Sequence, residues 1–483
     1  MIRRLVFLLA AAALVAPVAA SGFAPTDPLS SKQWYLMQIH AFDFWPDVSP
    51  TLAPVRVAVV DSGLDLGHPE FAGRVALARS FVGGDAIDRQ GHGTFVAGII
   101  AANADNNEGI TGIALSAQLL IAKVVRSDGT ISPVAEAKAI RWAADHGARV
   151  INLSLGGLRS RNRTEDTYSS VEQDAIEYAY AKGAVLVAAV GNGDQAPKTP
   201  WDLASYPAAL PHVIGVSSLA QDGSVPAFSN RDAFFNDVAA PGVGIVSTLP
   251  RSLTAARPSC VEQGYSICGP AEFRSADGTS YSAAEVSGAA ALLIAMKPTL
   301  RPDQVAALLE RSAADASPST GCRRCIGSRD PYTGWGQIDV SAALRALASP
   351  LPTPDRYESN DDAGERAFAL WGRRSIDVTA TLDFWDDQID VYKIRLRKGQ
   401  TVAVSLQGPA GTRPNLVLWR PGTQQVEGLS PTLQERRLTQ SVRDGATAHF
   451  LHRARQDGWY YVELKLPHPG AGQYRLHISK SRV

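Results

Sequence analysis

The chain is organised around a run of small residues, Gly278-Thr279-Ser280-Tyr281-Ser282-Ala283-Ala284-Glu285-Val286-Ser287-Gly288. It continues through alanines and leucines until Pro298 limits it. Because the run is small and apolar on every side, it predicts a helix that is buried in a core. Ser280 falls in the first turn, where unpaired N–H groups and the helix dipole favour a developing negative charge. A serine that merely caps the helix fits there equally well, so this run alone leaves both roles open.

Two upstream segments bear on that choice. Residues 57–63, Val-Ala-Val-Val-Asp-Ser-Gly, predict a buried strand that delivers Asp61 at its carboxyl end. Residues 91–102 begin with Gly-His-Gly-Thr and predict a glycine turn followed by a helix with His92 at its start. A lone aspartate or histidine in such a place is usually structural. The occurrence of all three contexts in one chain, in the order Asp, His, Ser, is far less expected by chance.

These motifs resemble the three active-site signatures of the subtilisin-like serine proteases, the subtilases. They are Asp-Ser-Gly at 61–63, Gly-His-Gly-Thr at 91–94 and Gly-Thr-Ser at 278–280. A fourth motif, Val-Ala-Ala-Val-Gly-Asn-Gly at 187–193, resembles the strand and turn that carry the family's oxyanion-hole asparagine, here Asn192. The matches follow the family order over about residues 33–345.

The resemblance implies a serine endopeptidase whose chemistry needs no cofactor. Ser280 would attack the peptide bond, His92 would take its proton, and Asp61 would orient the imidazole. Asn192 and the backbone N–H of Ser280 would stabilise the oxyanion. The sequence departs from the family after the nucleophile, at Tyr281, Ser282, Ala284 and Glu285, where Met, Ala, Pro and His are common. We expect these departures to change local helix packing.

Apolar strands alternate with helical segments between residues 55 and 347, which predicts a mostly parallel, doubly wound α/β sheet with its active groups at the carboxyl ends of the strands. The expected strands are 55–60, 119–124, 149–154, 184–190 and 213–217. The expected helices are 93–103, 132–146, 168–182, 281–296 and 302–313. The doubly wound fold of the subtilases agrees with this pattern.

Substrate-binding residues follow from the same resemblance. Ser154, Leu155, Gly156 and Gly157 are similar to the edge segment that pairs with the substrate backbone as an added strand. The main specificity pocket would be lined by Ala189, Val190 and Gly191, with Ser205 near its floor. Because no acidic residue is clearly placed there, apolar or broad specificity is favoured over a basic one.

The protease part contains a candidate structural calcium site. Residues 104–110 resemble the loop that wraps Ca²⁺ in many subtilases, with Glu70 where those proteins place a carboxylate. Glu70 and Asn106, together with backbone carbonyls, offer the hard oxygen ligands that Ca²⁺ prefers. A polar surface loop that caps a helix explains the same residues.

Four cysteines, Cys260, Cys268, Cys322 and Cys325, are an even number in a chain that we expect to be exported. The simplest pairing is local, Cys260–Cys268 and Cys322–Cys325, although four cysteines allow three connectivities. The two arginines between Cys322 and Cys325 also suit a redox pair. We favour a structural disulfide because neither a thioredoxin-like context nor further zinc ligands accompany the motif.

The ends of the chain predict export and a second domain. Residues 1–20 carry two arginines, a short apolar run and small residues, which is typical of a signal peptide. We expect a catalytic domain at 21–348, a proline-rich linker at 349–356 and a smaller all-β sandwich at 357–483. The last part resembles the pre-peptidase C-terminal domain of secreted bacterial proteases. Its expected strands include 402–406, 415–419, 459–464 and 474–478, and its aspartates 361, 362, 386 and 387 suit either calcium binding or turn capping.

The charge balance limits the range of partners. Lysine plus arginine and aspartate plus glutamate both number 47, so no nucleic-acid partner is implied. We expect a secreted or periplasmic monomer that acts on proteins or peptides and has no membrane association once the signal is removed. Two alternatives stay open: a catalytically silent pseudoprotease that binds peptides, and a peptide ligase or cyclase on the same fold.

Overall fold

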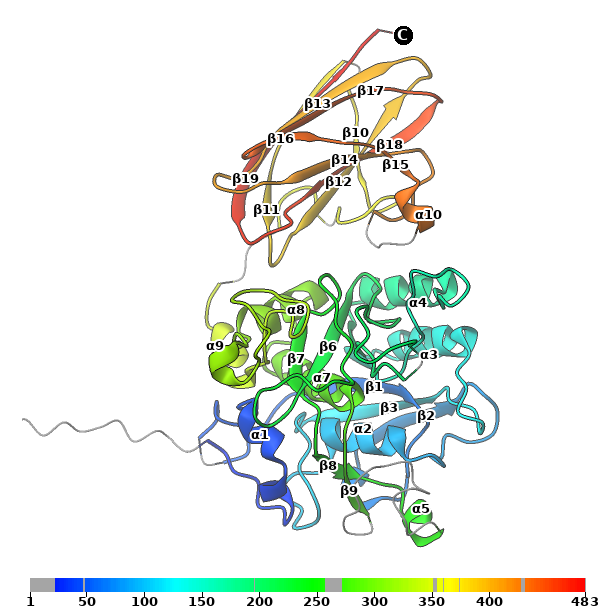
Figure 1. Ribbon diagram of the computed structural model, residues 1–483, viewed down its shortest axis with the longest axis vertical. Helices are drawn as coiled ribbons and strands as arrows, with labels where there is room; N and C mark the ends of the chain where they lie inside the picture. The colour runs from blue at the N-terminus through cyan, green and yellow to red at the C-terminus, as the bar shows by residue number, and fades with distance from the viewer. Residues whose placement is uncertain are drawn as a thin grey trace, which may run out of the picture.

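The computed structural model describes residues 22–46, 48–194, 196–256, 272–350, 354–358, 360–372, 374–426 and 431–482. The predicted signal peptide, the Cys260–Cys268 pair and part of the predicted linker lie outside the described residues. An α/β unit and a β unit follow one another along the longest axis of the molecule (Figure 1). Within the described ranges, no helix combines the length and the apolar character needed to cross a membrane.

The α/β unit is built on a seven-stranded parallel sheet. In spatial order its strands are β2 (Val75–Ser80), β3 (Ala117–Lys123), β1 (Val55–Asp61), β4 (Val150–Leu153), β5 (Val185–Ala189), β6 (Val213–Leu219) and β7 (Val238–Pro241). The expected parallel α/β fold is confirmed, and the ends of the expected strands lie within two residues of the observed ones. Two strands were missed. The edge strand β2 is partly exposed and lacks a buried apolar face, and β7 has only four residues.

Helices cover both faces of this sheet, as the alternation along β1 requires. Val57 and Val59 enter one apolar core, whereas Ala58 and Val60 enter the other. The first core contains α2 (His92–Ala101) and α7 (Thr279–Met296), and the second contains α3 (Pro133–Asp145) and α4 (Ser170–Ala181). The remaining elements of this unit include α1 (Trp34–Gln38), β8 (Ile245–Thr248), α5 (Arg251–Ala256), β9 (Phe273–Ala276), α8 (Pro302–Arg311) and α9 (Val340–Ala346).

Helix α7 is buried around its whole circumference, as its composition predicts. All but two of its 18 residues are buried. Gly288 allows a close approach, because a Cβ there would lie 2.7 Å from the Cβ of Ile113. The helix packs across β4, β5, β6 and β7 on one face of the sheet, and its first turn lies at the carboxyl edge of the sheet.

The C-terminal unit is a sandwich of two five-stranded sheets that share one apolar core. One sheet contains β10 (Phe368–Leu370), β12 (Ile389–Leu396), β18 (Gly458–Lys465), β14 (Asn415–Trp419) and β15 (Arg437–Gln440). The other contains β11 (Ser375–Asp383), β19 (Ala471–Lys480), β13 (Thr401–Gln407), β17 (Thr447–Arg453) and β16 (Val442–Asp444). A short helix, α10 (Pro431–Gln434), precedes β15 in the chain. The expected all-β sandwich is therefore confirmed.

The two units meet at the amino ends of the parallel strands. A cavity of about 1560 Å³ lies between them, lined by residues at the starts of β5 and β6, by residues that precede β7, and by the turn between β11 and β12. Ion pairs cross the contact, Arg366 to Glu177 at 3.1 Å and Arg311 to Asp386 at 3.9 Å. The sandwich thus faces the edge of the sheet opposite to the one where Asp61 lies (Figure 1).

Candidate active site

Asp61 and His92 meet at the carboxyl edge of the sheet. Asp61 ends β1 and is buried, and His92 opens α2 directly after Gly91, whose φ of 99° favours glycine. Nδ1 of His92 lies 2.9 Å from both carboxylate oxygens of Asp61. This contact occupies Nδ1 and leaves Nε2 as the nitrogen that can exchange a proton.

The surroundings of His92 shift the pKa of its imidazole. Burial disfavours the charged ring, but the charge of Asp61, its hydrogen bond and the charge of Asp88 outweigh burial and raise the pKa of His92 above 6.5. One third of the His92 side chain is exposed. The ring therefore contacts Asp61 on one side and remains accessible to an incoming molecule on the other.

Ser280 lies in the first turn of α7, where the helix dipole favours negative charge. Its Oγ donates a hydrogen bond to the backbone carbonyl of Ser154 at 3.2 Å. No hydrogen bond joins Ser280 to His92 in the described chain. Tyr281 of α7 packs against α2, with its ring centroid 6.0 Å from that of His92 and 4.4 Å from that of Phe95. In many ligand-free sites the serine–histidine bond forms only when substrate arrives.

Asn192 follows β5 and is fixed by the start of α7. Its Oδ1 accepts hydrogen bonds from the backbone N–H and the hydroxyl of Thr279, at 2.9 and 2.8 Å. Because the backbone N–H can only donate, it assigns the acceptor as Oδ1, and the Nδ2 amide is then a donor with no hydrogen-bond acceptor among the described residues. A Cβ on Gly278 would lie 3.5 Å from that Nδ2, which places the donor beside the turn that precedes Ser280.

Hydrogen bonds tie α7 to the end of β4. The Ser154 hydroxyl donates to the carbonyl of Ser280 at 2.7 Å and accepts from the side-chain amide of Asn152 at 2.9 Å. Asn152 in turn accepts a hydrogen bond from the Ser287 hydroxyl at 2.9 Å. Ser154 therefore fixes the main chain of Ser280.

Asp88 is a functional candidate that sequence reasoning missed. It is fully buried, and its Oδ1 accepts from the Ser62 hydroxyl and from the backbone N–H groups of Gln90 and Gly91, at 2.8 to 2.9 Å. Its Oδ2 accepts from the N–H and hydroxyl of Thr94, at 2.9 and 2.8 Å. These donors flank Asp61 on one side and His92 on both. An aspartate three residues before the Gly-His turn was the available signal.

The predicted substrate segment lies beside the predicted pocket floor. Gly157 pairs with Tyr206 through two backbone hydrogen bonds of 2.9 Å, and the Ser205 N–H donates to the carbonyl of Val190 at 2.8 Å. Gly191 adjoins Ser205, whose Oγ would lie 2.4 Å from a Cβ at that glycine. The side chains of Ala189 and Val190 are buried at the end of β5, Leu155 packs on the second core, and Gly156 approaches the Tyr206 carbonyl.

The predicted calcium residues also come together. Glu70 is fully buried and accepts from the Ile110 N–H at 2.9 Å and from the Asn106 side-chain amide at 3.3 Å. Asp27, which the sequence did not single out, accepts from the backbone N–H of Asn106 at 3.0 Å. Burial, opposed by the hydrogen bonds from Ile110 and Asn106 and assisted by the charges of Asp27 and Glu108, raises the pKa of Glu70 to about 7. The carboxylate oxygens of Glu70 and Asp27 are hard ligands of the kind that Ca²⁺ prefers, and each of them accepts a hydrogen bond in the described chain.

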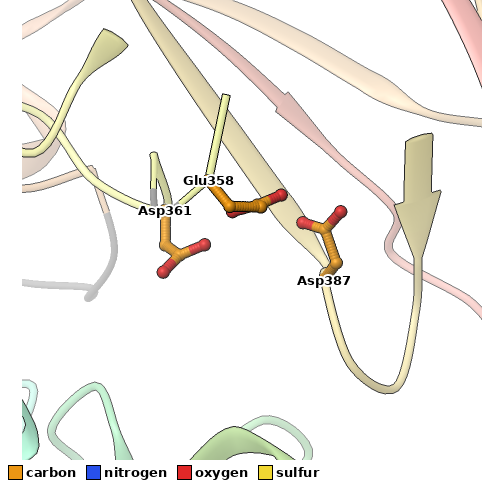
Figure 2. Close-up of side chains that lie close together, drawn as sticks. All are labelled: Glu358, Asp361 and Asp387. Atoms are coloured by element: carbon orange, nitrogen blue, oxygen red, sulfur yellow. The ribbon is translucent and has the colours of Figure 1, made fainter. Parts of the chain in front are cut away.

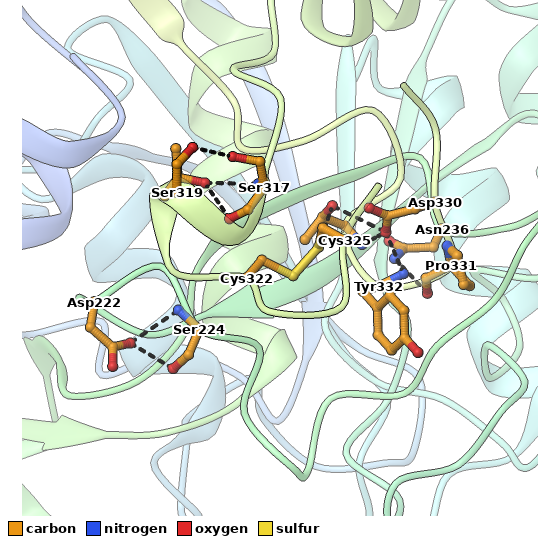
Figure 3. The surroundings of a disulfide bond; sticks show 12 residues. Asp222, Ser224, Asn236, Ser317, Ser319, Cys322, Cys325, Asp330, Pro331 and Tyr332 are labelled. Atoms are coloured by element: carbon orange, nitrogen blue, oxygen red, sulfur yellow. Dashed lines mark hydrogen bonds between the residues drawn. A yellow bond between two sulfur atoms is a disulfide. The ribbon is translucent and has the colours of Figure 1, made fainter. Parts of the chain in front are cut away.

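The Cys322–Cys325 disulfide is present, as predicted. Both cysteines are buried, pack against Ala316 and lie next to a turn that contains Asp330 and Tyr332 (Figure 3). Cys325 Sγ is 3.6 Å from the Thr333 hydroxyl. The buried position agrees with a structural bond.

Among the departures from the family pattern, Glu285 places an ionisable side chain in the core. It lies within α7, is fully buried, and neither carboxyl oxygen has a hydrogen-bond partner in the described ranges. Burial raises the pKa of Glu285 well above its ordinary value. Tyr281, Ser282 and Ala284 are buried on the same helix, so the departures lie within the packed core.

Comparisons with known proteins agree with this geometry. The sequence profile of the subtilase family matches residues 53–329. Thermitase of Thermoactinomyces vulgaris is 37% identical over 275 residues, which are 56% of this chain and 85% of thermitase. Subtilisin DY of Bacillus licheniformis is 33% identical over 295 residues, 61% of this chain and 92% of the relative. The solved structure of sphericase has a TM-score of 0.52 at 28% identity, covering 64% of this chain and 99% of sphericase.

Proposed function

Because the chain belongs to the subtilase family and is therefore a serine endopeptidase, we propose that it hydrolyses peptide bonds through an acyl-enzyme on Ser280. The observation that carries this assignment is the Asp61–His92 contact, which leaves Nε2 open at the edge where α7 presents Ser280. Asp61, His92, Ser280 and Asn192 are the proposed catalytic residues.

The chemistry follows from these positions. The Ser280 oxygen attacks the peptide carbonyl carbon while its proton passes to His92 Nε2, and Asp61 stabilises the imidazolium. The Nδ2 amide of Asn192 and the Ser280 N–H donate to the oxyanion. Collapse breaks the C–N bond, and His92 gives its proton to the leaving amine. Water then attacks the ester by the same route, which releases the acid and restores the serine.

We propose that the substrate chain lies along Ser154–Gly157 and that its side chain enters the space beside Gly191 and Ser205. The pairing of Gly157 with Tyr206 brings these two segments side by side, which supports this placement. Ser280 Oγ must leave the Ser154 carbonyl to react, so substrate that takes up that carbonyl would also release the nucleophile.

We also propose that residues 1–20 direct export and that the mature protein works as a secreted or periplasmic monomer. The catalytic domain would span 21–348 and the β-sandwich 357–483, joined by residues 349–356. Where Ca²⁺ is bound in the protease part, Asp27, Glu70 and Asn106 would hold it and stabilise the N-terminal segment.

A fluorophosphonate probe tests the proposal directly, since it labels an activated serine. The purified protein should be labelled, whereas Ser280→Ala and His92→Ala should not, and His40→Ala at an exposed histidine serves as the matched control. A folded wild type that stays unlabelled with and without Ca²⁺ would favour a peptide-binding pseudoprotease. Product masses from a peptide with a free amino terminus then separate hydrolysis from ligation.

A further inference from the structure

Three carboxylates converge in the C-terminal sandwich, far from the proposed catalytic residues. Each of Glu358, Asp361 and Asp387 offers an oxygen, and these oxygens all lie within 4.8 Å of one another. Glu358 and Asp361 come from the segment that enters the sandwich, and Asp387 comes from the turn between β11 and β12 (Figure 2). One buried oxygen each of Glu358 and Asp387 has no hydrogen-bond donor among the described residues.

Two buried polar side chains from the same segments, Asp390 and Asn360, also point to a ligand. Asp390 is fully buried at the start of β12, and its Oδ2 accepts from the Tyr474 hydroxyl at 2.5 Å. Its Oδ1 is buried without a donor in the described chain. Asn360, between the two entering carboxylates, is also fully buried. Such crowding of buried oxygens is costly unless a cation neutralises it.

We propose that Glu358, Asp361 and Asp387 bind a divalent cation of the Ca²⁺ type, which clamps the sandwich onto the protease unit. Ca²⁺ accepts six to eight oxygen ligands in flexible geometry, whereas Mg²⁺ needs a near-ideal octahedron and keeps its waters. A site assembled from two separate segments, with Asn360 and Asp390 behind it, suits the flexible ion.

The clamp follows from where Asp387 lies. Asp383 and Asp387 close a turn through two backbone hydrogen bonds, of 2.9 and 2.8 Å. The turn carries Phe384, Trp385 and Asp386 to the protease unit: Trp335 packs on the first two, with ring centroids 5.7 and 4.8 Å apart, and Arg311 of α8 pairs with Asp386 at 3.9 Å. A cation on Asp387 would fix the base of this docking turn and join it to the segment that arrives from the protease unit.

Calcium binding to the full chain tests the site, in a Ser280→Ala background that prevents self-digestion. Calorimetric titration of the EGTA-treated protein should give one ion fewer for Asp387→Asn, and one fewer for Glu358→Gln from the other segment. Asp377→Asn, at an exposed aspartate on β11, is the matched control and should bind as the parent does. Glu70→Gln keeps any ion of the protease unit separate in the count.

Hydrogen exchange tests the clamp in the same samples. Ca²⁺ should slow exchange at 384–386 and in α8 in the parent and in Asp377→Asn, and should leave Asp387→Asn unchanged. In EGTA the Asp387→Asn protein should melt no lower than the parent, because one of several crowded charges is gone. An equal ion count in all folded variants would overturn the site and leave three carboxylates that share protons. A lost ion with no change in exchange at the turn would overturn the clamp.

Discussion

Replacing Asp88 by asparagine tests whether the proposed His92 base depends on a carboxylate that does not touch it. Asp88 accepts five hydrogen bonds, from donors on both sides of His92 and from Ser62 next to Asp61. An asparagine can keep its oxygen toward three of these donors. Its amide then faces Thr94, whose hydroxyl can turn to accept but whose backbone N–H cannot.

The expected loss can be worked from that single orphaned donor. A buried donor without an acceptor costs about 1–3 kcal/mol. If that cost is felt at the His92 turn in the transition state, kcat/KM falls about 5-fold to 150-fold, since about 1.4 kcal/mol corresponds to one factor of ten. The charge of Asp88 also raises the pKa of His92. Removing it lowers that pKa, so the acidic limb of the pH profile should move to lower pH.

The assay is kcat/KM against pH on a chromogenic peptide, with Asp85→Asn as the control. Asp85 lies three residues earlier, on the surface, where it pairs with Arg89. A loss of fold alone would lower activity without moving the limb. If Asp88→Asn kept activity within twofold and its acidic limb stayed in place, the positioning role would be refuted.

Three further changes test the rest of the account. Asn192→Ala should lower kcat by about 10²–10³ with little change in KM, the range known for one oxyanion donor in subtilisin, checked by steady-state kinetics. Glu285 has a raised pKa in the folded state, so its stabilising contribution is full below the unfolded pKa and falls as pH rises. Glu285→Gln in the Ser280→Ala background should therefore flatten the fall above the unfolded pKa by up to about 1.4 kcal/mol per pH unit, measured by urea unfolding. Glu70→Gln should remove much of any Ca²⁺-dependent rise in Tm; an unchanged rise would place the ion elsewhere.

The positions of the main proposed catalytic groups could be predicted from the sequence, because each depends on a local feature of the chain. Asp61 ends a β-branched run and His92 begins a helix after a glycine, so their elements could be predicted. Once the strands are parallel, their carboxyl ends must share one edge, which brings Asp61 and Asn192 to the same side. The state of Ser280 could not be predicted, because its bond to the Ser154 carbonyl depends on how α7 packs against β4.

The role of Asp88 was missed for a related reason. Its donors belong to segments before and after His92 and to Ser62, and only the fold brings Ser62 to it. The same holds for Asp27 and Glu70, which meet through the loop at 105–110. Buried carboxylates that accept several hydrogen bonds produce no periodic pattern in the sequence. A pattern-based method therefore recognises only an acidic residue in a turn.

The placement of the β-sandwich limits what it can do to catalysis. Its contacts reach Glu177 in α4, Arg311 at the end of α8 and Trp335, on the side where the parallel strands begin. Asp61 and Asn192 lie where those strands end. A domain at the amino edge cannot cover the proposed catalytic residues, so its influence must pass through the packing of α4 and α8 against the sheet. The proposed cation would then govern how long the protease unit stays folded, while access of substrate to Ser280 stays the same.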